Sequence, residues 1–93
     1  MFVQEFSIVV PGDSFQHVDA CRVERQALRN WFAHTIVLDL SRARDATTAA
    51  FADLILLRRR LLNDGRDLRI SGLHDRAAKV YHVNRLTAVL PLR

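Results

Sequence analysis

The sequence predicts an α/β domain in which about four strands form a mostly parallel sheet and three helices pack mainly on one face. Three observations predict this class. Segments with strand composition alternate with segments of helical periodicity along the chain. Residues 35–38 form an apolar run without alternation, which is typical of a strand buried on both faces. Strands separated by crossover helices form parallel sheets with right-handed connections.

Length and composition indicate one globular domain. The chain has 93 residues, of which 49% are hydrophobic and 26% are charged. A chain of 10.7 kDa buries about 65% of its unfolded surface, which is enough for one modest core. We therefore expect residues 1–93 to form a single domain.

The first strand and helix follow from local signals. Residues 2–10 place apolar residues at both ends of a polar stretch and stop at Pro11-Gly12, as a strand before a turn does. A helix is expected from about Asp19 to Ala33, with Asp19 as its N-cap. Its apolar residues fall on one helical face, namely Ala20, Val23, Ala27, Leu28 and Trp31.

A buried strand at residues 35–38 precedes the second helix. The polar connection at residues 39–45 separates the two, and the helix is expected from about Thr47 to Asn63. Gly65 follows the helix and suits the left-handed C′ position. The apolar stripe of this helix comprises Ala50, Leu54, Leu57 and Leu61, widened by Phe51 and Leu62.

The last third of the chain predicts a strand, a helix and a second strand. Residues 68–70 form a short strand before Gly72, and residues 75–83 form a helix that Asn84 ends. Its inward side chains are expected to be Ala77, Val80 and Tyr81. Val89-Leu90 is expected to be a final strand, with Pro91 at a sheet edge or a strand end. Across the domain, Leu38, Leu54, Leu57 and Ile70 should share one core.

No enzyme signature is present in the sequence. The histidines do not pair at i, i+4, and three glycines cannot build a Gly-rich phosphate loop. Cys21, the only cysteine, excludes an internal disulfide and a cysteine-based metal cluster. We interpret Cys21 as a packed or partly exposed helix residue and not as a nucleophile. We expect no catalytic residue, no cofactor and no metal site.

The charge and the termini constrain the partners. The net charge of +4 comes from 13 arginines and Lys79, with acidic residues interleaved. Residues 58–60 are the one dense arginine run and lack an adjacent aromatic residue, which favours a solvated helix surface over a nucleic-acid site. No apolar run approaches the roughly 18 residues of a membrane span, and the N-terminus lacks a signal-peptide pattern. A cytoplasmic protein without membrane insertion is expected.

The loop at residues 39–48 is the first candidate site. In parallel sheets, ligands and partners meet the loops at the carboxyl ends of strands, and this loop is the most polar of them. Thr47 and Thr48 lie where the second helix begins. A hydroxyl there caps free backbone N–H groups. Phosphorylation is the other interpretation, because a helix N-terminus favours an anion and phosphate adds about −2 of charge.

Four ordered segments resemble the STAS domain family. They are residues 36–41 (Ile-Val-Leu-Asp-Leu-Ser), Thr47-Thr48, residues 63–70 and residues 83–86. The resemblance runs from about Ile8 to Pro91. It implies the STAS fold, with the leading hairpin reduced to one strand. The family includes bacterial anti-sigma factor antagonists, cytoplasmic tails of sulphate transporters and a subunit of ABC-type phospholipid transporters.

The resemblance also implies a switch residue. The family motif is Asp-Ser followed by a small residue and Gly, and these positions fall here on Thr47, Thr48, Ala49 and Ala50. Thr48 is then the phosphoacceptor candidate, with Thr47 as second choice. The implied partner-binding loop and helix start comprise Asp39, Ser41, Asp45, Thr47, Ala49 and Ala50.

Two functions follow from the resemblance, and a third follows from charge. The first is an anti-sigma factor antagonist that regulates transcription by binding an anti-sigma factor with serine kinase character, where ATP belongs to the partner. The second is a STAS subunit that supports the ATPase of an ABC-type phospholipid transporter, or serves a sulphate transporter, without phosphorylation. An arginine-rich nucleic-acid binder is the third. Monomer and dimer both stay open.

Overall fold

A parallel three-stranded sheet forms the centre of the protein. The computed structural model describes residues 3–93. Along the chain, the elements are β1 (Val3–Val9), β2 (Ser14–Phe15), α1 (His17–Arg29), β3 (Ala33–Asp39), β4 (Asp45–Ala46), α2 (Thr48–Asn63), β5 (Asp67–Ser71), α3 (Asp75–Val83) and the 3-10 helix η1 (Leu86–Ala88). The sheet order is β1-β3-β5, and every pair in it is parallel.

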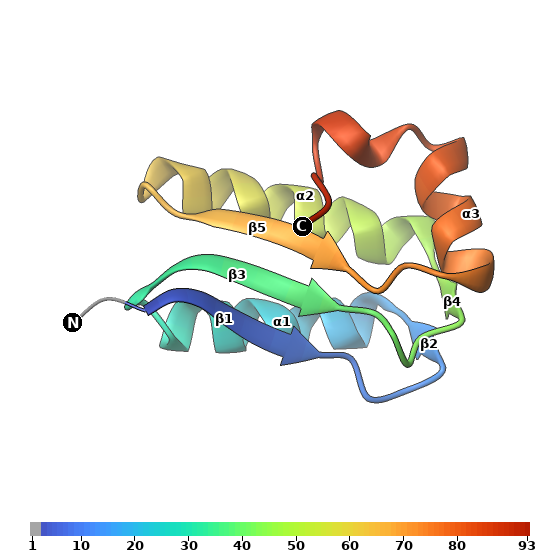
Figure 1. The fold of residues 1–93 in the computed structure, drawn as a ribbon, viewed down its shortest axis with the longest axis horizontal. Helices are drawn as coiled ribbons and strands as arrows, with labels where there is room; N and C mark the ends of the chain where they lie inside the picture. The colour runs from blue at the N-terminus through green and yellow to red at the C-terminus, as the bar shows by residue number, and fades with distance from the viewer. Residues whose placement is uncertain (1–2) are drawn as a thin grey trace.

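The two long helices cover one face of this sheet. Figure 1 shows α1 and α2 side by side behind the strands, with α3 at the carboxyl end of the sheet. Ile8, Leu38 and Ile70 lie next to one another in the strand register, and all three are buried. The loops after β1 and β3 add a second, two-stranded parallel pair, β2 with β4. The prediction of a parallel α/β domain with three helices is thus confirmed.

One core joins the sheet and the helices, as predicted. Leu38, Leu54, Leu57 and Ile70 are all buried in it. The apolar run of β3 is buried on both faces, since Ile36, Val37 and Leu38 are all inaccessible. The stripe of α2 is confirmed except at Leu62, which is exposed.

The predicted fourth strand at Val89-Leu90 is wrong. These residues follow η1 in a turn, where the backbone N–H of Leu90 donates to the Leu86 carbonyl. The buried Tyr81 hydroxyl donates to the Leu90 carbonyl at 2.5 Å. The tail pairs with β5 through an isolated bridge between Ile70 and Leu92. Within residues 3–93 the strands therefore divide three and two instead of forming one sheet of about four.

Helix α1 differs from its prediction at both ends. Its N-cap is Gln16, and Asp19 lies inside the helix, where its carboxylate accepts the Gln16 backbone N–H at 3.0 Å. The helix ends at Arg29, so the 69% exposed Trp31 lies outside the expected apolar face. Leu28 is also exposed at its surface.

Arg66 of the α2–β5 loop binds the backbone where α1 ends. The Arg66 guanidinium donates to the Ala27, Asn30 and Ala33 carbonyls at 3.1, 2.9 and 2.7 Å. In a helix that continued to Ala33, the Trp31 N–H would pair with the Ala27 carbonyl, which Arg66 satisfies instead. The Asn30 and Ala33 carbonyls are satisfied where the chain leaves α1 and enters β3.

The start of β1 and the last two helices follow the sequence closely. Predicted strand residues 3–9 form β1, while Phe2 lies outside the described residues. Helix α2 ends at Asn63, and Gly65 has the left-handed φ of 75° that its C′ position requires. Helix α3 has the predicted bounds and buries Ala77 and Tyr81.

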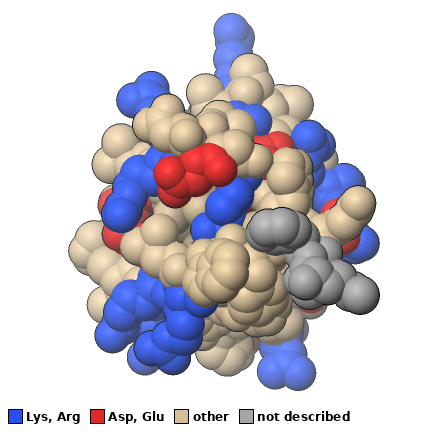
Figure 2. Space-filling view, turned by 90° about the vertical axis from the view of Figure 1, so that its left-hand side faces the viewer, with Lys and Arg blue, Asp and Glu red and all other residues tan. Residues whose placement is uncertain are grey.

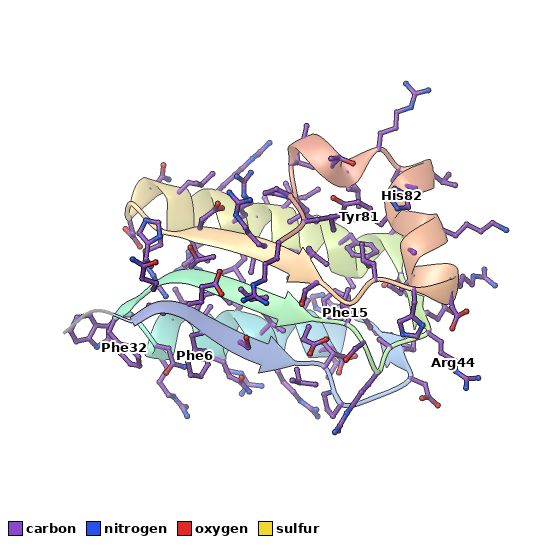
Figure 3. All side chains as sticks on the ribbon, viewed as in Figure 1. Phe6, Phe15, Phe32, Arg44, Tyr81 and His82 are labelled. Atoms are coloured by element: carbon purple, nitrogen blue, oxygen red, sulfur yellow. The ribbon has the colours of Figure 1, made fainter. Side chains whose placement is uncertain are left out.

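Three aromatic rings pack together at the carboxyl end of the sheet. Phe15 of β2, Phe51 of α2 and Tyr81 of α3 pack edge to face, with ring centroids 6.0 and 6.1 Å apart. Figure 3 shows Phe15 and Tyr81 directed inward at this end, whereas Arg44 projects outward. These three packed rings hold β2, the start of α2 and α3 together, and so they position the loops between these elements.

Candidate functional site

The loop after β3 carries the predicted site and is firmly anchored. Leu40 and Ala43 are fully buried, so the connection is less polar in space than its sequence suggests. Strand β4 lies in the middle of this loop and pairs with β2 through Ser14–Asp45 and Phe15–Ala46. The loop therefore reaches α2 in one defined conformation.

Asp39 and Ser41 lie where the loop meets the end of β5. The Asp39 carboxylate accepts the Ser41 backbone N–H at 2.8 Å. The Ser41 carbonyl faces His74 Nε2 at 2.8 Å, just before α3. The Asp39 side chain therefore shapes the loop, whereas the exposed Ser41 contributes its backbone N–H and carbonyl.

Asp45 connects the same loop to α3. Its carboxylate accepts the Ala46 backbone N–H at 2.8 Å and lies 3.5 Å from Arg76 Nε. The Ala77 backbone N–H donates to the Arg44 carbonyl at 2.9 Å. The first turn of α3 is therefore bound to the loop that leads into α2.

Thr47 and Thr48 have different roles. Thr47 is the N-cap of α2, and its hydroxyl accepts the Ala50 backbone N–H at 3.1 Å. Thr48 is the first residue of the helix and is exposed. The Thr47 hydroxyl is therefore used in capping α2, whereas the adjacent Thr48 hydroxyl has no hydrogen-bond partner within residues 3–93.

Ala49 and Ala50 differ in their exposure to solvent. Ala49 is exposed beside Thr48, in agreement with the expected surface. Ala50 is fully buried, because it begins the apolar stripe that continues through Leu54 and Leu57. The expectation that Ala50 belongs to a partner-binding surface is therefore wrong. The exposed surface at this helix start is Thr47, Thr48 and Ala49.

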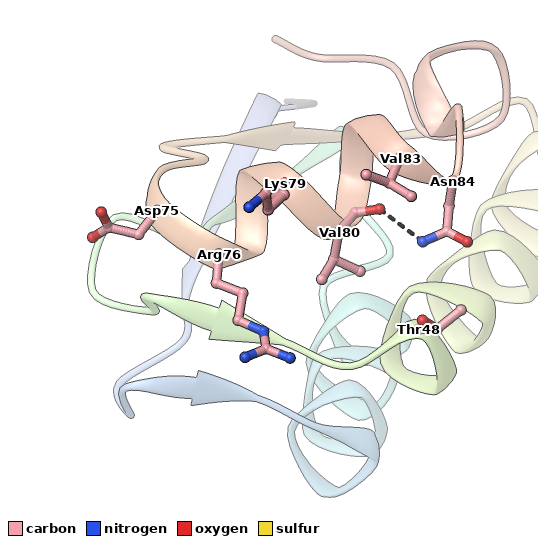
Figure 4. A pocket seen from close by; sticks show the side chains of 7 residues that line it. All are labelled: Thr48, Asp75, Arg76, Lys79, Val80, Val83 and Asn84. Atoms are coloured by element: carbon pink, nitrogen blue, oxygen red, sulfur yellow. Dashed lines mark hydrogen bonds between the residues drawn. The ribbon is translucent and has the colours of Figure 1, made fainter.

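An open groove of about 650 Å³ runs from Thr48 along α3. Figure 4 shows Thr48 on α2 as one side and α3 as the other. Its lining residues are Thr48, Asp75, Arg76, Lys79, Val80, Val83 and Asn84. Two cations and one anion stand at its edges, and two valines give it an apolar part. The α3 side of this groove was not predicted from the sequence.

Val83 is the residue whose apolar side chain could have indicated the α3 side of the groove. It is 73% exposed at the last turn of α3, although its position next to the inward residues Val80 and Tyr81 suggested only helix packing. Asp75 at the opposite end has a positive φ of 49°, a conformation that is uncommon for residues other than glycine. Such conformations persist where surrounding contacts hold them, and they cluster at functional sites.

Among residues 3–93, no three His, Cys, Asp or Glu side chains are grouped to hold a metal ion. None of the helices in that part of the chain combines the length and apolar composition that a membrane crossing requires. The groove presents the exposed Thr48, two cationic side chains, the exposed Val83 and the partly buried Val80.

No family model matches the chain, and no curated protein matches it either.

Proposed function

We propose that the protein is a STAS-like regulatory domain that binds a protein partner at the start of α2 and in the groove beside α3. Thr48 is its phosphorylation switch, and the partner is an anti-sigma factor with serine kinase character. One observation carries this proposal. The Thr48 hydroxyl is exposed and unpaired within residues 3–93, while the adjacent Thr47 performs the capping.

Charge explains how the switch would act. The groove edge carries Arg76, Lys79 and Asp75, and Asp45 lies 3.5 Å from Arg76 Nε, so two cations face two carboxylates there. A phosphate on Thr48 adds about −2 of charge and makes this surface clearly negative. The α2 N-terminus tolerates the anion, because its free N–H groups and dipole favour negative charge. Phosphorylation would therefore change the surface without unfolding the helix.

The second candidate is a constitutive, transporter-associated STAS subunit that contacts an ATPase without phosphorylation. Thr47 favours it. This residue stands where the family motif has aspartate, and its hydroxyl is occupied by the α2 cap. A kinase that requires an acidic residue before its target would not select Thr48.

Ion pairing argues against nucleic-acid binding by the arginine run at residues 58–60. Arg58 pairs with Asp67 at 2.8 Å, and Arg60 pairs with Glu24 at 2.8 Å. Only Arg59 of the run has no acidic partner within residues 3–93. Figure 2 shows one side of the molecule, where basic side chains project around the face with acidic side chains between them.

Binding of the natural partner, captured from the native host with the parent protein, tests the proposal. Thr48→Glu should bind at least about tenfold more weakly, or roughly 1.4 kcal/mol. Thr48→Ala should bind as the parent does and should not be labelled by the cognate kinase. Gln26→Glu adds the same charge on the exposed side of α1 and should leave affinity unchanged. Equal affinity of the Thr48→Glu and Thr48→Ala variants would exclude the switch and favour the constitutive subunit.

A further inference from the structure

Three reactive side chains meet at the surface between α1 and α2. Cys21 and His17 lie four residues apart on α1, so they share one helix face. Asp53 comes from α2 and lies against the same imidazole ring. Cys21 is exposed. The sequence alone suggested an ordinary helix cysteine, because nothing in it connects Asp53 with the other two residues.

The geometry arranges the three groups in a line. Asp53 Oδ2 lies 2.5 Å from His17 Nδ1, and Cys21 Sγ lies 3.6 Å from His17 Nε2. When the carboxylate accepts the Nδ1 proton, the Nε2 lone pair faces the thiol. A nucleophile beside a base that a third group orients is the arrangement of an activated thiol. Because carboxylate and sulfur contact opposite nitrogens, the three groups do not converge on a metal position.

Charged side chains flank Cys21 along α1. Three residues after Cys21, the Glu24 carboxylate is held by Arg60 of α2 at 2.8 Å. Four residues after it, Arg25 is exposed, and within residues 3–93 it has no acidic partner. His17 is the group that contacts the thiol, and Asp53 of α2 lies on the far side of its ring. Glu24 with its partner Arg60, and Arg25, are the charged groups one turn further along α1. Arg25 leaves a free cation one turn away, where it can also attract an anionic reagent.

We propose that Cys21 is a modification site that forms a mixed disulfide with an anionic low-molecular-weight disulfide. His17 Nε2 takes the Sγ proton, and the thiolate attacks one sulfur of the small disulfide. The Sγ–S bond forms as the S–S bond of the reagent breaks, and the leaving thiolate takes the proton from His17. Cys21 is thereby oxidised while half of the reagent is reduced to a thiol. Cys21 is the nucleophile, His17 the base and Asp53 a positioning residue.

Oxidised glutathione is the probe, and intact-mass spectrometry measures the rate of adduct formation on the full chain. At neutral pH, His17→Gln should react at least about tenfold more slowly, the low end of what a positioned base contributes. Asp53→Asn should fall between His17→Gln and the parent. His82→Gln and Asp13→Asn are matched controls at other exposed positions and should react as the parent does. Cys21→Ser should form no adduct.

The pH dependence separates proton transfer from a structural effect. An ordinary cysteine with a pKa of about 8.5 is ionised without a base at strongly alkaline pH. The His17→Gln and Asp53→Asn rates should therefore converge on the parent rate there. If His17→Gln reacts more slowly than the parent by the same factor at both pH values, or reacts as fast as the parent at neutral pH, the role of His17 as base is overturned.

Reagent charge tests Arg25. Arg25→Gln should slow the reaction with anionic oxidised glutathione and leave the reaction with cationic cystamine unchanged or faster. Arg29→Gln lies one turn further along α1 and should change neither rate. Equal slowing of both reagents by Arg25→Gln would contradict the preference for an anionic disulfide. Circular dichroism and thermal melting confirm that each variant is folded before its rate is compared. The proposal is independent of the role of Thr48.

Discussion

Gly72 lies directly against Ser41: a Cβ on Gly72 would be 2.7 Å from the Ser41 backbone nitrogen and 2.8 Å from Asp39 Oδ1. Gly72 also has a left-handed φ of 72°. These two features let the loop after β5 pack onto the loop after β3. The contact brings α3 beside the start of α2, and the groove between them depends on it.

Gly72→Ala should therefore be strongly destabilising. The left-handed conformation alone costs a non-glycine residue about 1–2 kcal/mol, and the backbone contact adds to it. We expect a loss of at least about 2 kcal/mol in the free energy of unfolding, measured by urea denaturation.

Gly65→Ala is the matched control for this substitution. Gly65 has a φ of 75°, but no atom lies within 4 Å of the Cβ that it would acquire. It should lose only the conformational part, about 1–2 kcal/mol. Equal losses at the two glycines would show that the Ser41 contact relaxes freely.

Local signals explain which parts of the fold could be predicted from the sequence. The bounds of α3 and the end of α2 follow from apolar periodicity and from stop residues such as Gly65. The failures at Trp31 and Val89-Leu90 coincide with side-chain hydrogen bonds to the backbone. Arg66 donates to carbonyls around the end of α1, and the Tyr81 hydroxyl donates to the Leu90 carbonyl. Apolar periodicity along the chain does not report such bonds.

The candidate site divides in the same way. Thr47 and Thr48 were placed correctly at the helix start, because their position follows from the number of residues between β3 and α2. The α3 wall of the groove was missed, since it depends on the Ala77–Arg44 backbone hydrogen bond. The spacing of His17 and Cys21 was visible in the sequence, but the position of Asp53 beside them was not.

Arg66 provides a second test of these long-range contacts. Its guanidinium donates to three carbonyls around the end of α1. Arg66→Gln should lower the free energy of unfolding by about 2–3 kcal/mol, because charged hydrogen bonds are lost and partly buried carbonyls are left unpaired. The exposed Arg59 is the control, and Arg59→Gln should stay within about 0.5 kcal/mol of the parent. Urea denaturation of both variants measures the difference, and equal stabilities would contradict the capping role.

Leu54 tests the packing of α2 on the sheet. It is fully buried, whereas Leu56 two residues later is exposed. Leu54→Ala should lower the free energy of unfolding by about 2–5 kcal/mol, from lost burial and the cavity left behind. Leu56→Ala should change it by less than about 0.5 kcal/mol. If Leu54→Ala melts at the parent temperature, the helix does not pack on the sheet through this face.

The last prediction separates capping from switching at the start of α2. Thr47→Ala removes the hydroxyl that accepts the Ala50 N–H, so it should cost about 1 kcal/mol of stability. Thr48→Ala removes a hydroxyl without a partner in residues 3–93 and should stay within about 0.5 kcal/mol of the parent.

Thr48→Glu should keep or raise the stability of the domain, because a negative charge in the first helical turn gains about 0.3–1 kcal/mol from the dipole. This gain should shrink as salt is added, since an exposed charge is screened. Thermal melting at low and high salt measures both effects. If Thr48→Glu instead destabilises the domain as much as Thr47→Ala does, weaker partner binding by that variant would report damage to α2. A stable Thr48→Glu protein makes the same loss of binding a property of the surface charge.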